Sequence, residues 1–298
     1  MSMVAVKPPY TLILRDCDMI DSPRENDDCF GTMVCFHSRY HLGDKHDHKD
    51  PEEFLKHLLF HYYSSNEKSG HGKLVYDFLK TGKSDEARIE YNKSSHEWEL
   101  LTKNFWSSIR EYSVCTGYPA SPKGKDVPDW FIDECVSVLS MKDLVKLVEY
   151  LDDVVILPLY LYDHGGITMN TIGFHCPWDS GQVGWIYADK DKILHEFGGD
   201  KLTPELREKA EKLLRGETDY YDHYIRGDCY GYQLYKDDEE IDSCWGFIGG
   251  QDDLRDSIED YMPDECKGIM NYLEYRDDDP DIEDILQEYE DEFEMDLD

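Results

Sequence analysis

Acidic residues outnumber basic residues by more than two to one, and this excess limits what the chain can fold into and bind. The sequence contains 66 Asp and Glu against 31 Lys and Arg in 298 residues, which gives a formal net charge of -35. A surface this negative repels nucleic-acid phosphates and anionic lipids and attracts basic proteins. We therefore expect a basic protein partner, and we expect neither direct nucleic-acid binding nor membrane binding.

The composition indicates that the charge lies on a folded body. Hydrophobic residues make up 40% of the chain and aromatic residues 13%, whereas disordered acidic chains contain few aromatic residues. No run approaches the roughly 20 apolar residues that a membrane-spanning helix needs, and the N-terminus does not resemble a signal peptide. The nine cysteines include no CxxC pair, which favours reduced, mostly buried thiols. We expect a soluble, cytoplasmic protein.

Strand-like patterns occur in two regions of the chain. Runs rich in β-branched and aromatic residues lie at 10–15 and 31–38 and recur between 154 and 249. The second region is interrupted by a predicted helix over 203–225, and the acidic turn at 237–239 predicts an antiparallel hairpin. We predict an α+β fold in which residues 1–48 and 154–250 form a core with a mainly antiparallel sheet.

The segment between these regions has helical patterns. Asp50-Pro51 is a typical helix start, and apolar residues then recur at helical spacing. We predict a second helix over 86–112, from the spacing of Trp98, Leu101 and Phe105, and a third over 141–151. Residues 49–153 are therefore predicted to be a helical insertion, and residues 251–298 a separate acidic C-terminal segment.

The end of this C-terminal segment combines acidity with apolar periodicity. Residues 277–298 contain 13 acids and no Lys or Arg, while apolar residues from Ile282 to Leu297 recur at intervals of three and four. Two interpretations remain open: a frayed, solvated tail, or a helix whose apolar stripe docks while its acids face a basic partner. The candidate partner-binding residues are Asp277, Asp278, Asp279, Asp281, Glu283, Asp284, Glu288, Glu290, Asp291, Glu292 and Glu294.

Four histidines lie close together in the sequence, namely His37, His41, His46 and His48. His37 and His41 have the spacing with which one helix offers two ligands to a divalent metal. His37, however, ends a strand-like run, and Gly43-Asp44 indicates a turn, so the helical geometry that gives this spacing meaning is not expected. We interpret these histidines as polar turn residues and keep metal binding as the alternative.

Asp163, His164, His175 and Cys176 are of the types that form a Cys/His nucleophile or a metal-dependent hydrolase site. Adjacent residues on an extended chain point to opposite sides, so His175 is not expected to face Cys176. We favour a loop that turns on glycine and buries Trp178, and we keep a hydrolase as an alternative function. The sequence contains neither a GxGxxG nor a Walker A pattern, and we expect no cofactor.

Several segments of the strand regions carry a family resemblance. Residues 31–46, 157–171, 174–193, 221–235 and 241–250 resemble a family of acidic hypothetical proteins encoded by phages and other mobile elements. That family is similar in size and setting to phage inhibitors of bacterial immunity of the anti-Gabija type. The resemblance implies an anti-defence protein in the host cytoplasm that binds an immune nuclease complex and blocks its access to DNA. It assigns no functional residue.

Taken together, these patterns predict a non-enzymatic inhibitor that acts through its acidic surface and by steric occlusion. The expected partner is a basic, DNA-binding host defence protein or nuclease, and self-association into a homo-oligomer is compatible with this function. The alternatives are the hydrolase and a phage accessory protein whose charge serves solubility alone.

Overall fold

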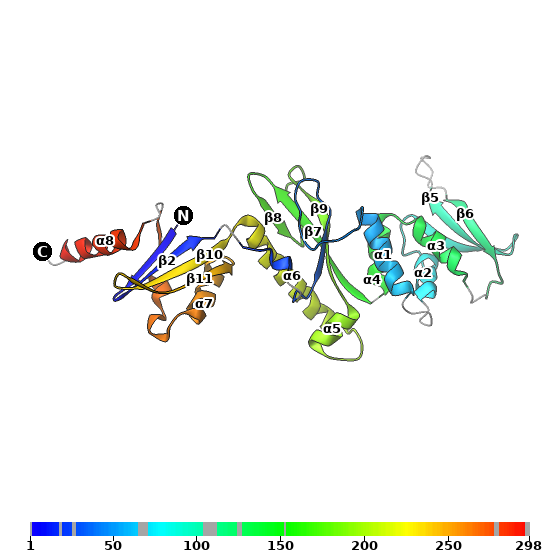
Figure 1. Cartoon of the computed structure of the whole chain (residues 1–298). Helices are drawn as coiled ribbons and strands as arrows, with labels where there is room; N and C mark the ends of the chain where they lie inside the picture. The colour runs from blue at the N-terminus through cyan, green and yellow to red at the C-terminus, as the bar shows by residue number, and fades with distance from the viewer. Residues whose placement is uncertain are drawn as a thin grey trace. The chain divides into compact units, whose positions relative to one another are not determined.

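The chain has an α+β fold, with 37% helix, 33% strand and three antiparallel sheets (Figure 1). This confirms the predicted fold class, although the strands are distributed over three sheets. The chain divides into two compact units. The first contains Met1–Cys29, Tyr160–Gln182 and Arg215–Asp298, and the second contains Phe30–Leu159 and Val183–Leu214. The computed structural model describes residues 2–17, 20–25, 28–64, 71–103, 112–123, 127–151, 153–276 and 280–295.

The first unit is built on a five-stranded sheet in which all neighbouring strands are antiparallel. The predicted hairpin is present, and Asp237 in its turn has a φ of 55°. The first strand was not predicted from the sequence. The strands lie in the order β11 (Glu239–Ile248), β10 (Cys229–Lys236), β2 (Tyr10–Asp16), β1 (Ser2–Lys7) and β12 (Glu274–Arg276).

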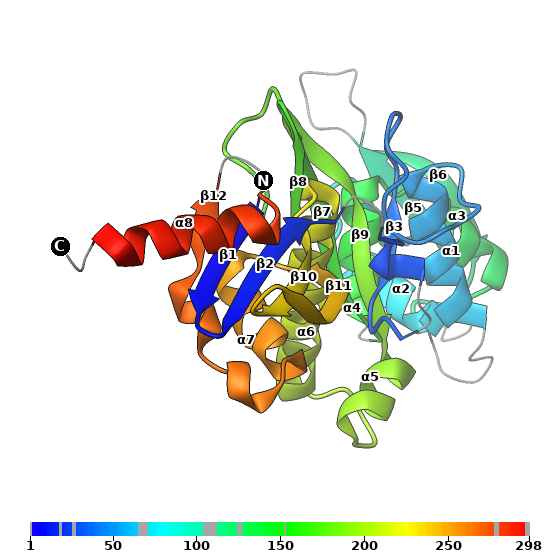
Figure 2. The same ribbon diagram turned by 60° about the vertical axis from the view of Figure 1, so that its left-hand side comes forward.

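The two faces of this sheet pack against different elements. Met3, Leu12 and Leu14 point to one face, where they meet helix α7 (Gln251–Tyr261) and the short 3-10 helices η2 (Asp264–Cys266) and η3 (Ile269–Tyr272). Val4 and Ile13 point to the other face because successive strand residues alternate. The second face is contacted by helix α8 (Ile282–Met295), which crosses β1 and β2 in Figure 2.

The second sheet has four strands, and the unit boundary passes through two of them and through helix α6 (Pro204–Arg226). All four of its strands lie within the segments predicted from the sequence, and α6 corresponds to the predicted helix. Gly227, with a φ of 81°, follows the end of α6. Near the start of the chain, η1 (Pro23–Glu25) places the buried Arg24 against Glu217 of α6, at 3.3 Å. The strand order is β3 (Thr32–Cys35), β9 (Ser180–Asp189), β7 (Val154–Asp163) and β8 (Ile167–Asn170).

The third sheet overturns part of the predicted helical insertion. Residues 86–112, expected to form one helix, instead provide β4 (Ala87–Asn92) and β5 (Glu97–Lys103). The central strand β5 pairs antiparallel with β4 on one side and with β6 (Tyr112–Pro119) on the other. Residues 104–111 lie outside the described residues. The buried side chains on β5 are Trp98 and Leu100. Burial along this segment therefore repeats every two residues, which is the period of a strand.

Helices complete the second unit around this sheet. The predicted helix starts at Asp50 and Met141 are confirmed, and the Asp50 carboxylate accepts a hydrogen bond from the Glu53 N-H at 2.8 Å as an N-cap. Their apolar faces form one core with β4 and β5, which includes Phe54, Leu100 and Leu144. These helices are α1 (Pro51–Ser64), α2 (His71–Lys80), α3 (Asp129–Ser137) and α4 (Met141–Leu151), with α5 (Lys190–Phe197) following β9.

Two further predictions concern the state of the cysteines and the length and hydropathy of the helices. All nine cysteines are free; four are buried, four are partly buried and Cys115 is exposed. The absence of disulfides agrees with the prediction, but fewer than half of the thiols are fully buried. In the described part of the chain, no helix is both long and apolar enough to cross a membrane.

Candidate functional site

The predicted acidic helix exists as α8, and its start is held by side-chain and backbone hydrogen bonds. The Asp281 carboxylate accepts from the Asp284 N-H at 3.0 Å, and the Asp281 carbonyl accepts from the Ile285 N-H at 3.3 Å. Asp281 is thus the N-cap. Glu283 and Asp284 in the first turn interact favourably with the positive end of the helix dipole. The acids therefore help to form the helix as well as to charge it.

An apolar contact attaches α8 to the sheet of the first unit. Ile285 is 1% exposed and packs against Val4 and Ile13, with Val6 and Tyr235 at the edge of the contact. Burying one such side chain contributes roughly 1.5–3 kcal/mol. The interpretation as a helix with a docked apolar stripe therefore describes residues 282–289 correctly, and the alternative of a frayed tail does not.

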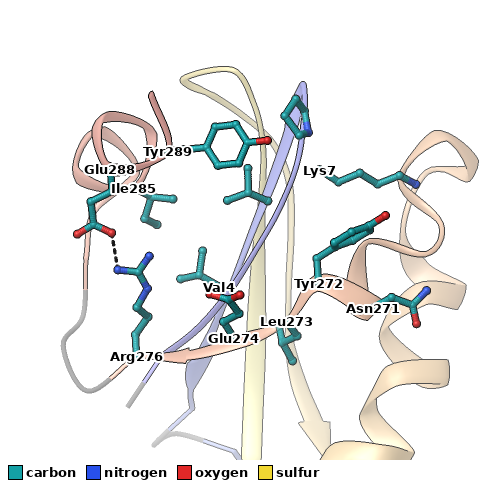
Figure 3. Close-up of a pocket in the computed structure, with 12 residues that line it drawn as sticks. Val4, Lys7, Asn271, Tyr272, Leu273, Glu274, Arg276, Ile285, Glu288 and Tyr289 are labelled. Carbon is teal, nitrogen blue, oxygen red and sulfur yellow. Dashed lines mark hydrogen bonds and ion pairs between the residues drawn. The ribbon is translucent and has the colours of Figure 1, made fainter. Parts of the chain in front are cut away.

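Two arginines of the sheet hold the helix in register. Arg15 on β2 donates a hydrogen bond to the Pro280 carbonyl at 3.0 Å, one residue before the N-cap. Arg276 on β12 forms an ion pair with Glu288 of α8, which Figure 3 shows as a dashed line. A partly exposed ion pair of this kind contributes about 0–1 kcal/mol. The sequence pattern did not reveal either contact, because both depend on how α8 packs against the sheet.

The outward surface of α8 carries a stripe of carboxylates. Asp281, Asp284, Glu288 and Asp291 are all exposed, and their spacing of three, four and three residues places them on one helix face. Exposed Glu283 lies beside them. Only the backbone of Glu290, Glu292 and Glu294 is described within α8, and Asp277, Asp278 and Asp279 lie outside the described residues.

A groove of about 550 Å³ lies beside this helix, between α8, β1, β12 and η3. Val4, Leu273 and Ile285 form the apolar part of a lining that is mainly polar, and Tyr289 of α8 and Tyr272 of η3 stand on opposite sides of the groove (Figure 3). Tyr272 is 57% exposed. Charged groups border this lining, as at many sites that receive an apolar side chain of a partner. The remaining lining residues are Val6, Lys7, Pro8, Asn271, Glu274, Arg276 and Glu288.

The predicted histidine cluster separates into two parts. His37 accepts hydrogen bonds from the backbone N-H groups of Arg39 and Tyr40, so it is a turn residue as expected, and His41 is exposed. His46 and His48 lie together, with ring centroids 5.5 Å apart. The described residues include no group of three His, Cys, Asp or Glu that could hold a metal ion.

A third imidazole, that of His57, lies near this pair and was not among the predicted site residues. The His57 ring on α1 lies 5.1 Å from His48 between centroids. Desolvation by burial and the neighbouring His57 and His46 lower the pKa of His48, although Glu53 and Asp47 act in the opposite direction. The available sequence signal was the i, i+3 spacing of Phe54 and His57 on the predicted helix, which places both rings on one face.

The residues considered for a hydrolase are arranged around Asp179. The Asp179 carboxylate lies 3.5 Å from the Cys176 sulfur and 3.5 Å from His164 Nδ1. Among the described contacts Cys176 meets this carboxylate and no imidazole, and His175 is exposed. A nucleophilic cysteine needs a cationic neighbour, such as a protonated imidazole. The four residues therefore do not assemble the site that their types suggested.

The loop that contains Cys176 corrects a further expectation. Trp178 was predicted to be buried but is 91% exposed, and Ile172 in the same loop is 82% exposed. The loop is held by polar contacts instead: the Asn170 side chain accepts from the N-H groups of Ile172 and Gly173, at 3.1 and 2.7 Å. The loop conformation therefore does not depend on burying the indole.

Comparison of the chain with protein-family models, with curated proteins and with solved structures finds no match.

Proposed function

We propose that this chain is a phage-encoded, non-enzymatic inhibitor that binds a basic, DNA-handling nuclease of bacterial immunity and blocks its access to DNA. The observation that carries the proposal is the attachment of α8, whose apolar residue Ile285 is buried while its carboxylates are exposed. Together with a net charge of -35, this makes α8 an ordered anionic surface. A disordered tail would lose more conformational entropy on binding.

The carboxylate stripe on α8 resembles a DNA strand in that it presents closely spaced negative charges. Residues three or four apart on a helix have Cβ atoms about 5–6 Å apart, so Asp284, Glu288 and Asp291 present closely spaced negative charges. Lys and Arg side chains that neutralise DNA phosphates can pair with these carboxylates. Such pairing weakens as salt rises, because the Debye length is about 10 Å at 0.1 M ionic strength.

The groove beside α8 supplies the second element of the proposed interface. Exposed charge pairs steer encounters and set specificity, but a tight complex usually needs apolar or aromatic anchors that are buried on binding. Tyr272 and Tyr289 border this mainly polar groove directly beside the acidic stripe, and their rings are the aromatic surface that a partner can cover. A partner side chain inserted there adds binding energy that does not depend on salt, and the bound chain then covers the nuclease surface.

The test measures DNA cleavage and DNA binding by purified bacterial immune nucleases in the presence of the chain. The variant replaces three exposed acids of α8, as Glu283→Gln, Asp284→Asn and Asp291→Asn. At about 0.5 kcal/mol for each exposed pair, inhibition should weaken about tenfold. Raising the salt concentration should narrow the difference between the wild type and the variant.

A matched control removes the same charge from the second unit, as Asp133→Asn, Glu134→Gln and Glu208→Gln, all at exposed positions. This control should inhibit within about twofold of the wild type if the position of the charge matters. Equal loss in both variants would indicate a general effect of net charge. Unchanged inhibition by the α8 variant, or turnover of a substrate by the chain alone, would contradict the proposal.

A further inference from the structure

A second cavity, entirely within the second unit, is lined by basic and aromatic side chains and by the carboxylate of Asp189. Its volume is about 240 Å³. His48, which precedes α1, and His57 on α1 line it together with Lys192 on α5. In a chain with a net charge of -35, three basic side chains around one small cavity are unexpected. Thr32, Phe54 and Tyr187 also line the cavity and add hydroxyl groups and aromatic surface.

The imidazoles at this cavity repel one another when they are protonated. His48 lies between His57 and His46, with ring centroids 5.1 and 5.5 Å away. His46 Nε2 lies 2.9 Å from the Cys35 carbonyl, and its buried Nδ1 meets no hydrogen-bond partner in the described part of the chain. Burial and the two neighbouring rings lower the pKa of His48. An anion in the cavity would remove this cost.

The carboxylates nearest to these rings already have hydrogen-bond donors. The Asp189 side chain accepts from the Lys192 backbone N-H at 2.8 Å, as the N-cap of α5. The Glu53 side chain accepts from the Lys49 backbone N-H at 2.9 Å. Both carboxylates accept from the backbone and keep their negative charge, and His48, His57 and Lys192 are the basic residues of the lining.

We propose that this cavity binds a small phosphate-bearing molecule, with the phosphate held by Lys192, His48 and His57. Phosphate oxygens accept charge-assisted hydrogen bonds from Lys and protonated His, and these are about twice as strong as neutral hydrogen bonds. The volume is below the roughly 300–1,000 Å³ of typical cofactor sites. The ligand is therefore inorganic phosphate or a sugar phosphate, with the sugar packed against Phe54 and Tyr187. The site is separate from the proposed interface on α8.

Binding at this site takes up protons. His48 faces His46 and His57, which lower its pKa, and Glu53 and Asp47, which raise it; Asp189 and Lys192 also line the cavity. A bound phosphate adds negative charge next to His48 and favours its protonated form. Binding should therefore strengthen as the pH falls toward the ordinary histidine range, until the phosphate itself becomes protonated.

The test is titration calorimetry of the full chain with inorganic phosphate, ribose 5-phosphate and ribose. Each titration is run in two buffers that differ in ionisation enthalpy. Ribose 5-phosphate should bind at least about tenfold more tightly than ribose, and proton uptake should accompany binding. Equal binding of inorganic phosphate identifies the phosphate group alone as the ligand chemistry, whereas tighter binding of ribose 5-phosphate identifies a sugar phosphate.

The variants His57→Gln and Lys192→Met should each weaken phosphate binding about tenfold. Both positions are exposed, so the fold should be retained, and circular dichroism checks this. Lys190→Met is the matched control, because Lys190 lies two residues away and pairs with Asp153 at 3.8 Å. Absence of binding up to about 10 mM of either phosphate compound, or equal binding by the Lys192 and Lys190 variants, would overturn the proposal. No nuclease is needed, so this result is independent of the proposed function.

Discussion

Asp143 is the buried carboxylate with the largest set of described hydrogen-bond donors. It is 1% exposed on α4 and accepts from the Ser84 hydroxyl at 2.5 Å and from the backbone N-H groups of Asp85 and Glu86 at 3.1 and 3.3 Å. Its carboxylate thereby fixes the start of β4. Replacing it with alanine leaves these donors without a partner inside the protein.

We predict that Asp143→Ala lowers the free energy of unfolding by about 2–4 kcal/mol, measured by urea denaturation. Glu134→Gln is the control; Glu134 lies on the exposed surface of α3, and the change should stay within about 0.5 kcal/mol. A loss below about 1 kcal/mol for Asp143→Ala would mean that water replaces the carboxylate at no cost.

Asp85, next to this network, provides a prediction for pH. Hydrogen bonds from Lys146 and Lys142 lower the pKa of its carboxyl to about 2, from an ordinary value of 3.8. Because this pKa is lowered, the stabilisation from the Asp85 carboxylate and the two lysines is fully present above pH 3.8 and is lost as the pH falls toward 2. In an NMR titration, Lys146→Met should raise the Asp85 midpoint toward 3.8. An unchanged midpoint would exclude Lys146 as the main cause.

Two tryptophans test how exposure sets the cost of substitution. Trp98 on β5 is 5% exposed, and its ring has edge-to-face contacts with the rings of Tyr76 and Tyr91, with centroids 5.3 Å away in each case. Trp178, in contrast, is 91% exposed. Trp98→Ala should cost about 3–5 kcal/mol of unfolding free energy, and Trp178→Ala should cost less than about 0.5 kcal/mol. If Trp178→Ala proved equally destabilising, the loop would depend on the indole after all.

At the scale of elements, sequence patterns succeeded where one face of an element decides its burial. Helix α6 was predicted to within a few residues because Thr203-Pro204 is a typical helix start and Gly227 a typical helix end. Strands β4 and β5 were predicted as a helix because Trp98, Leu101 and Phe105 also fit a helical period. In the structure, the buried side chains of β5 are Trp98 and Leu100, which are two residues apart as in a strand. A short segment can satisfy both periods, and only its packing against α2 and α3 decides.

Helix α8 shows how one contact can hold a whole element. Ile285 is its one fully buried side chain among those described. We predict that Ile285→Asp detaches α8 from the sheet, because an unpaired carboxylate would face Val4 and Ile13. Amide hydrogen exchange in α8 should then accelerate at least about tenfold.

The control for this variant changes the solvent side of the same helix. Gln287 is exposed on α8, and Gln287→Asp adds the same charge without touching the sheet. Exchange in α8 should stay within about twofold of the wild type in this control. Equal acceleration in both variants would show that added charge, and not loss of the apolar contact, releases the helix.

At the scale of the whole molecule, one part of the candidate site could be predicted from the sequence and the other could not. The acids of α8 were predicted because charge and period can be read along one segment. The groove was not, because it joins β1 at one end of the chain to η3 and α8 at the other. His57 illustrates the same limit, since its relation to His48 depends on how α1 packs. Sites made by distant segments need the fold before they can be recognised.

The net charge itself predicts how stability responds to salt. With a charge of -35, folding brings carboxylates together, and their mutual repulsion destabilises the compact state. Raising sodium chloride from about 0.01 M to about 0.5 M shortens the Debye length from about 30 Å to below 10 Å and screens this repulsion. The melting temperature should therefore rise with salt, measured by differential scanning calorimetry. Potassium chloride should reproduce the effect if screening is the cause, and a melting temperature that falls with salt would mean that pairs such as Arg276–Glu288 outweigh the repulsion.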